Sequence, residues 1–202
     1  MAMELKNSMF IHIPKCAGRT INRILKVYVK GANGILGENK DSHFLPDTDK
    51  QVFAFVRHPA TFVHSLWHHR ARSNRRAPQW NWQDYLRLER VCKSEDYNTF
   101  VENILDGKNY VNDYYNFYVG KYQNVQFGKM ENLVEDLIKI LKQNNEDFDE
   151  KGIRENIYVH GANNKQTNKP ISVNESMTYD QLKRLITESE QELCRKFDYH
   201  AF

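Results

Sequence analysis

The sequence predicts an α/β fold in which a parallel sheet is flanked by helices. Short apolar runs that end at a proline or a charge alternate with longer segments whose apolar residues recur at helical spacing. Strands that alternate with helices are typical of a parallel sheet covered on both faces. The length of 202 residues suits one such domain and is short for two. We therefore expect a single domain over residues 1–202.

The first strand and helix are predicted between residues 9 and 30. Residues 9–13 form a short apolar run that stops at Pro14, which is typical of a buried strand. A helix over residues 19–30 is indicated by residues at helical spacing, namely Ile21, Ile24, Leu25 and Tyr28. Residues 30–42 are rich in glycine and asparagine and should form a loop.

The same alternation continues along the chain. Residues 51–59 contain a second buried strand, and a helix that restarts at Pro59 should run to residue 72. Residues 82–119 should be mostly helical. A third strand is expected around Val125 and Phe127. The helix after it places four residues on one face, which are Leu133, Leu137, Ile140 and Leu141. A last helix carries Leu182, Leu185, Ile186, Leu193 and Phe197 on one side, and residues 160–170 should form a polar surface loop.

Composition excludes some classes of protein. An apolar share of 40% with 27% charged residues is ordinary for a globular protein, and a net charge of +3 is too small to indicate nucleic acid by itself. Three widely spaced cysteines favour free thiols in a reducing compartment. The sequence shows neither a secretory signal nor a membrane span. We therefore expect a cytoplasmic protein with no clear nucleic-acid partner.

The turn between the first strand and helix has the residues of an anion site. Ala17 and Gly18 let backbone N–H groups come close to a ligand, and the N-terminus of the helix adds positive charge. Lys15 and Thr20 add a cation and a hydroxyl. The stretch differs from the nucleotide-hydrolase pattern G-x-x-x-x-G-K-[ST], because Arg19 stands in place of the lysine. A plain strand-to-helix turn with a solvated Lys15 is the alternative.

A second motif strengthens the case for a ligand. Arg57 and Pro59 end the second strand just as Pro14 and Lys15 end the first. Ligands of parallel sheets bind at the carboxyl ends of the strands. The two motifs could therefore share one site.

Together these motifs resemble those of sulfotransferases that use 3′-phosphoadenosine 5′-phosphosulfate (PAPS). The stretch IPKCAGRTI, residues 13–21, is similar to the 5′-phosphosulfate loop of that family. Arg57 and Ser65, eight residues apart in VFAFVRHPATFVHSLWHH, match the Arg and Ser with which that family binds the 3′-phosphate of the cofactor. Residues 125–137 and 191–202 are also similar, so the resemblance covers about half the chain in scattered blocks. It implies a P-loop-like sulfotransferase fold, closest in style to the carbohydrate branch.

The resemblance implies a reaction and a set of residues. The reaction is sulfuryl transfer from PAPS to an acceptor hydroxyl without a metal ion, leaving adenosine 3′,5′-bisphosphate. Lys15 and His43 are the implied catalytic residues, with His43 as the base; a non-catalytic loop histidine is the alternative. The implied cofactor-binding residues are Lys15, Cys16, Ala17, Gly18, Arg19, Thr20, Arg57, Ser65, Lys165 and Lys169. The chain departs from the family at Arg19, where Thr or Ser is usual, and at His58, where Asn or Asp is common.

Other features leave alternatives open. His64 and His68 have the spacing of zinc-binding H-E-x-x-H, but Ser65 replaces the glutamate, so we expect no metal site. An Arg-rich segment follows, with Arg70, Arg72, Arg75 and Arg76 beside Trp80 and Trp82. It suits an anionic carbohydrate, a nucleic acid or a phospholipid head group, or is a solvated basic face.

The acceptor is expected to be a sugar or another small hydroxyl compound. Two other functions compete with sulfuryl transfer. One is a P-loop kinase, which shares the sheet, loop and helix architecture. The other is a non-catalytic module that binds an anion, a polysaccharide or a nucleic acid, whose affinity would fall steeply with salt.

Overall fold

The chain forms two compact units in the computed structural model. The first unit consists of Met1–Arg57 and Asn116–Thr167, and the second of His58–Tyr115 and Asn168–Phe202. The structure describes residues 2–35, 47–72, 90, 92–107, 109–155 and 177–200. Each unit is described by itself. Two compact units can belong to one domain, so the single domain over residues 1–202 stays a prediction.

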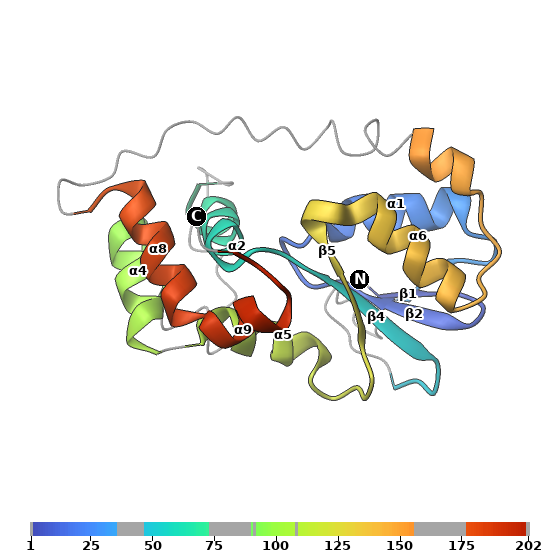
Figure 1. Cartoon of the computed structure of the whole chain (residues 1–202), viewed down its shortest axis with the longest axis horizontal. Helices are drawn as coiled ribbons and strands as arrows, with labels where there is room; N and C mark the ends of the chain where they lie inside the picture. The colour runs from blue at the N-terminus through green and yellow to red at the C-terminus, as the bar shows by residue number, and fades with distance from the viewer. Residues whose placement is uncertain are drawn as a thin grey trace. The chain divides into compact units, whose positions relative to one another are not determined.

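The first unit is built on a five-stranded sheet with the order β3-β1-β2-β4-β5 (Figure 1). The strands are β1 (Ala2–Glu4), β2 (Ser8–Ile11), β3 (Asn33–Ile35), β4 (Gln51–Val56) and β5 (Gln126–Lys129). β2, β4 and β5 run parallel to one another, whereas β1 is antiparallel to both β2 and β3. The α/β class is confirmed, but the prediction of a parallel sheet is wrong at one edge, and the sheet is mixed.

The antiparallel edge has a local cause. A tight turn joins β1 to β2, closed by a 2.9 Å hydrogen bond from the Leu5 N–H to the Ser8 carbonyl, and so short a connection permits only antiparallel pairing. β3 lies inside the segment predicted as a loop and pairs with β1 at the edge of the sheet. With three residues, two of them exposed, it is too short to show the alternation that marks a strand.

Two helices of the first unit lie on the same side of the sheet in Figure 1. They are α1 (Gly18–Tyr28) and α6 (Leu133–Gln143), the latter preceded by the short 3-10 turn η3 (Met130–Asn132). Both bury most of the apolar face that the sequence predicted, although Tyr28 on α1 and Leu133 on α6 are only half-buried. The segment after α6 is tied to the end of α1, since Lys30 N–H donates to the Asp147 carbonyl and Asp149 N–H to the Tyr28 carbonyl, each at 2.9 Å.

The second unit is helical. Its elements are α2 (Pro59–Trp67), the π-helix η1 (His68–Arg72), α4 (Tyr97–Asp106), the first part of α5 (Tyr110–Val119), α8 (Tyr179–Ser189) and α9 (Gln191–Lys196). Aromatic rings fill its core; Phe62, for example, lies edge-on to Tyr114 with 5.1 Å between ring centroids. The helix predicted to residue 72 thus changes to π geometry at His68, and the predicted last helix divides at Glu190.

All three cysteines, Cys16, Cys92 and Cys194, are buried free thiols, as their number and spacing predicted. Among the described helices, none is both long enough and apolar enough to cross a membrane.

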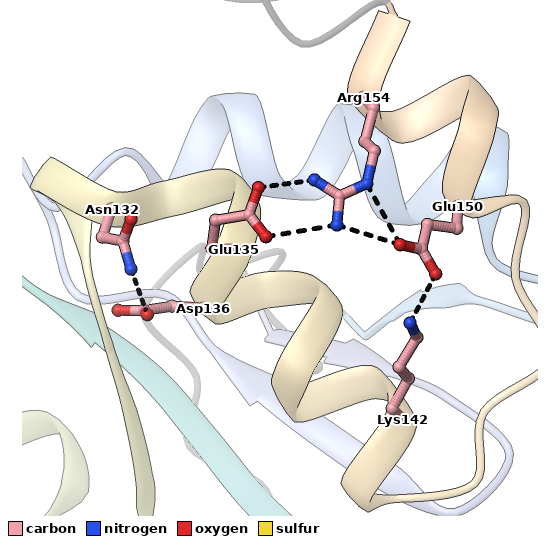
Figure 2. Close-up of polar contacts among 6 residues, drawn as sticks. All are labelled: Asn132, Glu135, Asp136, Lys142, Glu150 and Arg154. Atoms are coloured by element: carbon pink, nitrogen blue, oxygen red, sulfur yellow. Dashed lines mark hydrogen bonds and ion pairs between the residues drawn. The ribbon is translucent and has the colours of Figure 1, made fainter.

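An exposed charge network joins α6 to the helical residues 150–155 (Figure 2). Arg154 donates to both carboxylate oxygens of Glu135 and to Glu150, and Lys142 pairs with Glu150 at 2.6 Å. The Arg154 hydrogen bond lowers the pKa of Glu135 below its usual value. The hydrogen bond from Lys142, and then that from Arg154, lowers the pKa of Glu150.

Arg154→Ala is therefore expected to raise the pKa of Glu135 toward its ordinary value. The pKa of Glu150 should rise less, because Lys142 remains. An NMR titration of the side-chain carboxyl carbons measures both, and Lys142→Ala is the matched control that should move Glu150 more than Glu135. An unchanged Glu135 in Arg154→Ala would contradict the network. Because the pairs are exposed, the melting temperature should change little.

Candidate anion site

The turn between β2 and α1 has an unusual backbone. Lys15 and Ala17 both adopt the left-handed conformation, with φ of 67° and 60°, whereas Cys16 between them does not. A turn that holds left-handed residues can form a concavity of backbone N–H groups that binds anions. The Cys16 N–H is not one of these groups, because it donates to the Ile13 carbonyl at 3.4 Å. A left-handed residue other than glycine costs roughly 1–2 kcal/mol. Strain of this kind is concentrated at ligand sites, so two such residues in one turn point to a binding role.

The helix that follows the turn has no side-chain cap. Ala17 is its N-cap residue and cannot accept a hydrogen bond through its side chain, and the first turn of α1 contains no acidic residue. The side chains of His58, Asp96 and Thr178 cap α2, α4 and α8, whereas α6 and α9 lack a side-chain cap as α1 does. The first N–H groups of α1, with the positive end of the helix dipole, are thus placed to bind an external anion.

Gly18 is required by packing. A Cβ at this position would overlap the ring of His12, which stacks on Phe10 with 6.4 Å between ring centroids. The small residue at the start of α1 therefore lets the His12 ring lie against the helix. The sequence explained Gly18 by the approach of a ligand or by a plain bend, and neither explanation included the His12 ring.

Gly18→Ala is expected to destabilise the protein by about 1–3 kcal/mol, as overpacking does. The pair His12→Ala with Gly18→Ala should recover most of that loss, because the ring that clashes is gone. Urea denaturation of the wild type, both single variants and the double variant gives the coupling free energy. Additive effects would contradict the packing explanation.

Arg57 lies beside the turn. β2 and β4 are parallel neighbours, with Phe10 opposite Phe53 and Ile11 opposite Ala54, so their carboxyl ends meet at one edge of the sheet. Arg57 directly follows β4, is half-buried, and places its Nη1 3.5 Å from the Lys15 carbonyl oxygen. The structure thus places Arg57 beside the Lys15 turn, as the sequence predicted for these two residues.

The other predicted site residues differ in how far they are buried and in the unit to which they belong. Cys16 and Thr20 are buried, Lys15 and Ala17 are half-buried, and Arg19 is exposed. Ser65 lies half-buried on α2, in the second unit. Three predicted residues lie outside the described part of the chain, namely His43, Lys165 and Lys169.

Sequence reasoning missed the role of His58. Its Nδ1 accepts a hydrogen bond from the Ala60 N–H at 3.3 Å, which caps α2. Imidazole here supplies the kind of acceptor that Asn or Asp supplies at an N-cap. A signal was present, since a helix that begins with Pro59 makes the preceding residue its N-cap.

His64 and His68, which lie on either side of Ser65, belong to a packed cluster of rings. The His64 ring is 5.3 Å from that of His68 and 5.2 Å from that of Tyr179, measured between centroids. Arg70 is buried, with 6% of its surface exposed, so a solvated basic face is wrong for this residue. Arg75, Arg76, Trp80 and Trp82 lie outside the described residues.

The first unit also has two hollows, of about 420 and 510 Å³, that share Lys50 in their lining. Lys50 precedes β4 and is held by Glu4 at 2.9 Å. The hollows therefore lie by the amino end of this strand. Parallel sheets bind ligands at the opposite ends of their strands, which favours the Lys15 turn as the site.

No family model, no curated protein and no solved structure matches the chain.

Proposed function

We propose that this protein is a sulfotransferase that moves a sulfuryl group from PAPS to an acceptor hydroxyl. The observation that carries the proposal is the contact of Arg57 with a turn that holds two left-handed residues. This contact lies at the carboxyl edge of two parallel strands, before a helix without a side-chain cap. The arrangement supports a ligand with more than one anionic group.

The residues of the edge fit the anionic groups of PAPS. The backbone at the left-handed residues Lys15 and Ala17, the Lys15 side chain and the N-terminus of α1 would hold the 5′-phosphosulfate. The planar guanidinium of Arg57 suits a phosphate, which it can bind through two parallel N–H groups. Ser65 is its partner at the 3′-phosphate by resemblance to the family.

In this proposal each residue has a separate task. When bound, PAPS supplies the sulfuryl group. Lys15 and the N–H groups of the turn stabilise the negative charge that develops during transfer, as preorganised donors do. His43 takes the proton of the acceptor hydroxyl. The acceptor is a sugar or another small hydroxyl compound.

A thermal-shift titration tests the proposal. Adenosine 3′,5′-bisphosphate is compared with ATP plus Mg²⁺ at fixed ionic strength, and a ligand at a hundred times its dissociation constant should add about 2.7 kcal/mol to the free energy of unfolding. Stabilisation by the bisphosphate is expected. Stabilisation by ATP plus Mg²⁺ alone would favour the kinase, and no response to either ligand would contradict both enzymes.

His43→Ala is the companion variant. It should bind the bisphosphate as the wild type does and lose transfer of labelled sulfate from PAPS to a panel of sugars. Full transfer activity in His43→Ala would assign the base to another residue.

A further inference from the structure

We propose that His58 is a positioning residue of the cofactor site, and that it holds the start of α2 through a hydrogen bond to the tail segment, residues 197–200. The assignment rests on the proposed function, because it concerns the helix that carries Ser65. His58 and the tail segment belong to the same unit. The segment would contribute to cofactor binding without touching the cofactor.

The tail segment is held in a defined path after α9. Asp198 adopts the left-handed conformation, with φ of 50°. The chain then reverses, and the Tyr199 N–H donates to the Cys194 carbonyl at 2.9 Å. This reversal places the Tyr199 ring edge-on to the His58 ring, 5.2 Å away between centroids. It also brings the carbonyl oxygen of His200 to 3.1 Å from His58 Nε2.

The two hydrogen bonds of His58 require one form of its ring. Because Nδ1 accepts from the Ala60 N–H, it must carry a lone pair, and the ring proton of a neutral imidazole then resides on Nε2. That proton points to an acceptor, the His200 carbonyl. The side chain is buried, with 7% of its surface exposed, so either bond is costly to lose.

Histidine does here what a shorter cap residue cannot. Asn or Asp at position 58 could accept the hydrogen bond from the Ala60 N–H. Neither side chain has a group in the place of His58 Nε2 that could at the same time donate to the His200 carbonyl. His58 therefore joins two elements that are distant in sequence, the start of α2 and the tail segment. Thr61 closes the same end of the helix by donating its Oγ1 proton to the His58 carbonyl at 3.0 Å.

The consequence for binding follows from the order of residues. His58 comes directly after Arg57, and Ser65 lies on the helix that His58 caps. A start of α2 that is fixed by the tail segment orders Ser65, which lies in the same unit, before the ligand arrives. Preorganisation of this kind raises affinity without a new contact.

The tautomer gives a test without any ligand. Long-range ¹H–¹⁵N NMR of the full chain should show His58 as a single species with its proton on Nε2. Tyr199→Ala, which removes the ring that packs on His58, should convert the signal to exchanging tautomers. A proton on Nδ1, or rapid exchange in the wild type, would overturn the proposal whether or not the protein binds PAPS.

Affinity tests the positioning role. His58→Asn keeps a cap for α2 but loses the bond to the tail segment, and we expect it to weaken binding of adenosine 3′,5′-bisphosphate about tenfold by calorimetry. Tyr199→Ala should have a similar effect, and the two together little more than either alone. Asp96→Ala is the matched control, because it removes the cap of α4 in the same unit.

Each outcome then has one meaning. Wild-type affinity in both His58→Asn and Tyr199→Ala would overturn the proposal. An equal loss in Asp96→Ala would overturn it too, because the effect would then come from general destabilisation of the unit. If the wild type itself fails to bind the bisphosphate, the proposed function fails, while the tautomer experiment still decides whether His58 holds the tail segment.

Discussion

Arg57→Ala is expected to weaken the binding of adenosine 3′,5′-bisphosphate by about 10- to 100-fold. The half-buried guanidinium lies at the edge of the sheet, 3.5 Å from the Lys15 carbonyl oxygen, so its positive charge lies where two parallel strands end. A hydrogen bond between charged groups contributes about 1.5–3 kcal/mol, which corresponds to that loss of affinity. Calorimetric titration at fixed ionic strength measures it.

Two further variants give the result its meaning. Arg57→Lys keeps the charge but loses the planar pair of donors, so its affinity should fall between those of the wild type and Arg57→Ala. Arg23→Ala removes an exposed arginine from α1 in the same unit and should bind as the wild type does. Equal losses in Arg57→Ala and Arg23→Ala would show a diffuse effect of net charge and contradict a site at Arg57.

The positions of Lys15 and Arg57 could be predicted because each follows a buried strand. β2 and β4 are buried on both faces, so each is a continuous apolar run whose end is marked by a polar residue or a proline. Parallel neighbours end at one edge of the sheet, so the sequence alone predicts that Arg57 lies beside the turn at Lys15. The left-handed residues of the turn could not be predicted, because neither Lys15 nor Ala17 favours that conformation.

Other features depend on contacts between distant segments. β3 is stabilised by pairing with β1 rather than by its own Asn-Gly-Ile sequence. The cap by His58 was open to prediction from Pro59, but its bond to the His200 carbonyl joins residues 142 positions apart. The break at Glu190 likewise has no turn residue to mark it. Such contacts are properties of the folded chain, and periodicity does not report them.

Glu190 is the residue from which we expect the largest effect on stability. It separates α8 from α9 and is 1% exposed. Its carboxylate accepts the backbone N–H groups of Val111, at 2.6 Å, and Asn112, at 3.2 Å, and so caps the start of α5. Burial raises the pKa of Glu190 to about 7, outweighing the two backbone hydrogen bonds, which lower it, while the charge of Asp113 adds to the rise.

The raised pKa sets the direction of a pH effect. Between pH 4.5, the ordinary value for this carboxyl, and pH 7 the folded protein keeps a proton on Glu190 that the unfolded chain releases. The free energy of unfolding should therefore fall as the pH rises through this range, by about 3 kcal/mol in total. Above pH 7 both states are ionised, and the contribution of Glu190 to the slope should vanish.

Glu190→Gln isolates this contribution. Its side chain does not titrate, so the difference in free energy of unfolding between wild type and variant should change with pH from 5 to 7.5, while the titration of other groups cancels. Urea denaturation across this range measures the difference, and a constant value would contradict the assignment. Glu190→Ala should be less stable than Glu190→Gln at every pH, by about 1–3 kcal/mol, because it leaves the buried Val111 N–H without an acceptor.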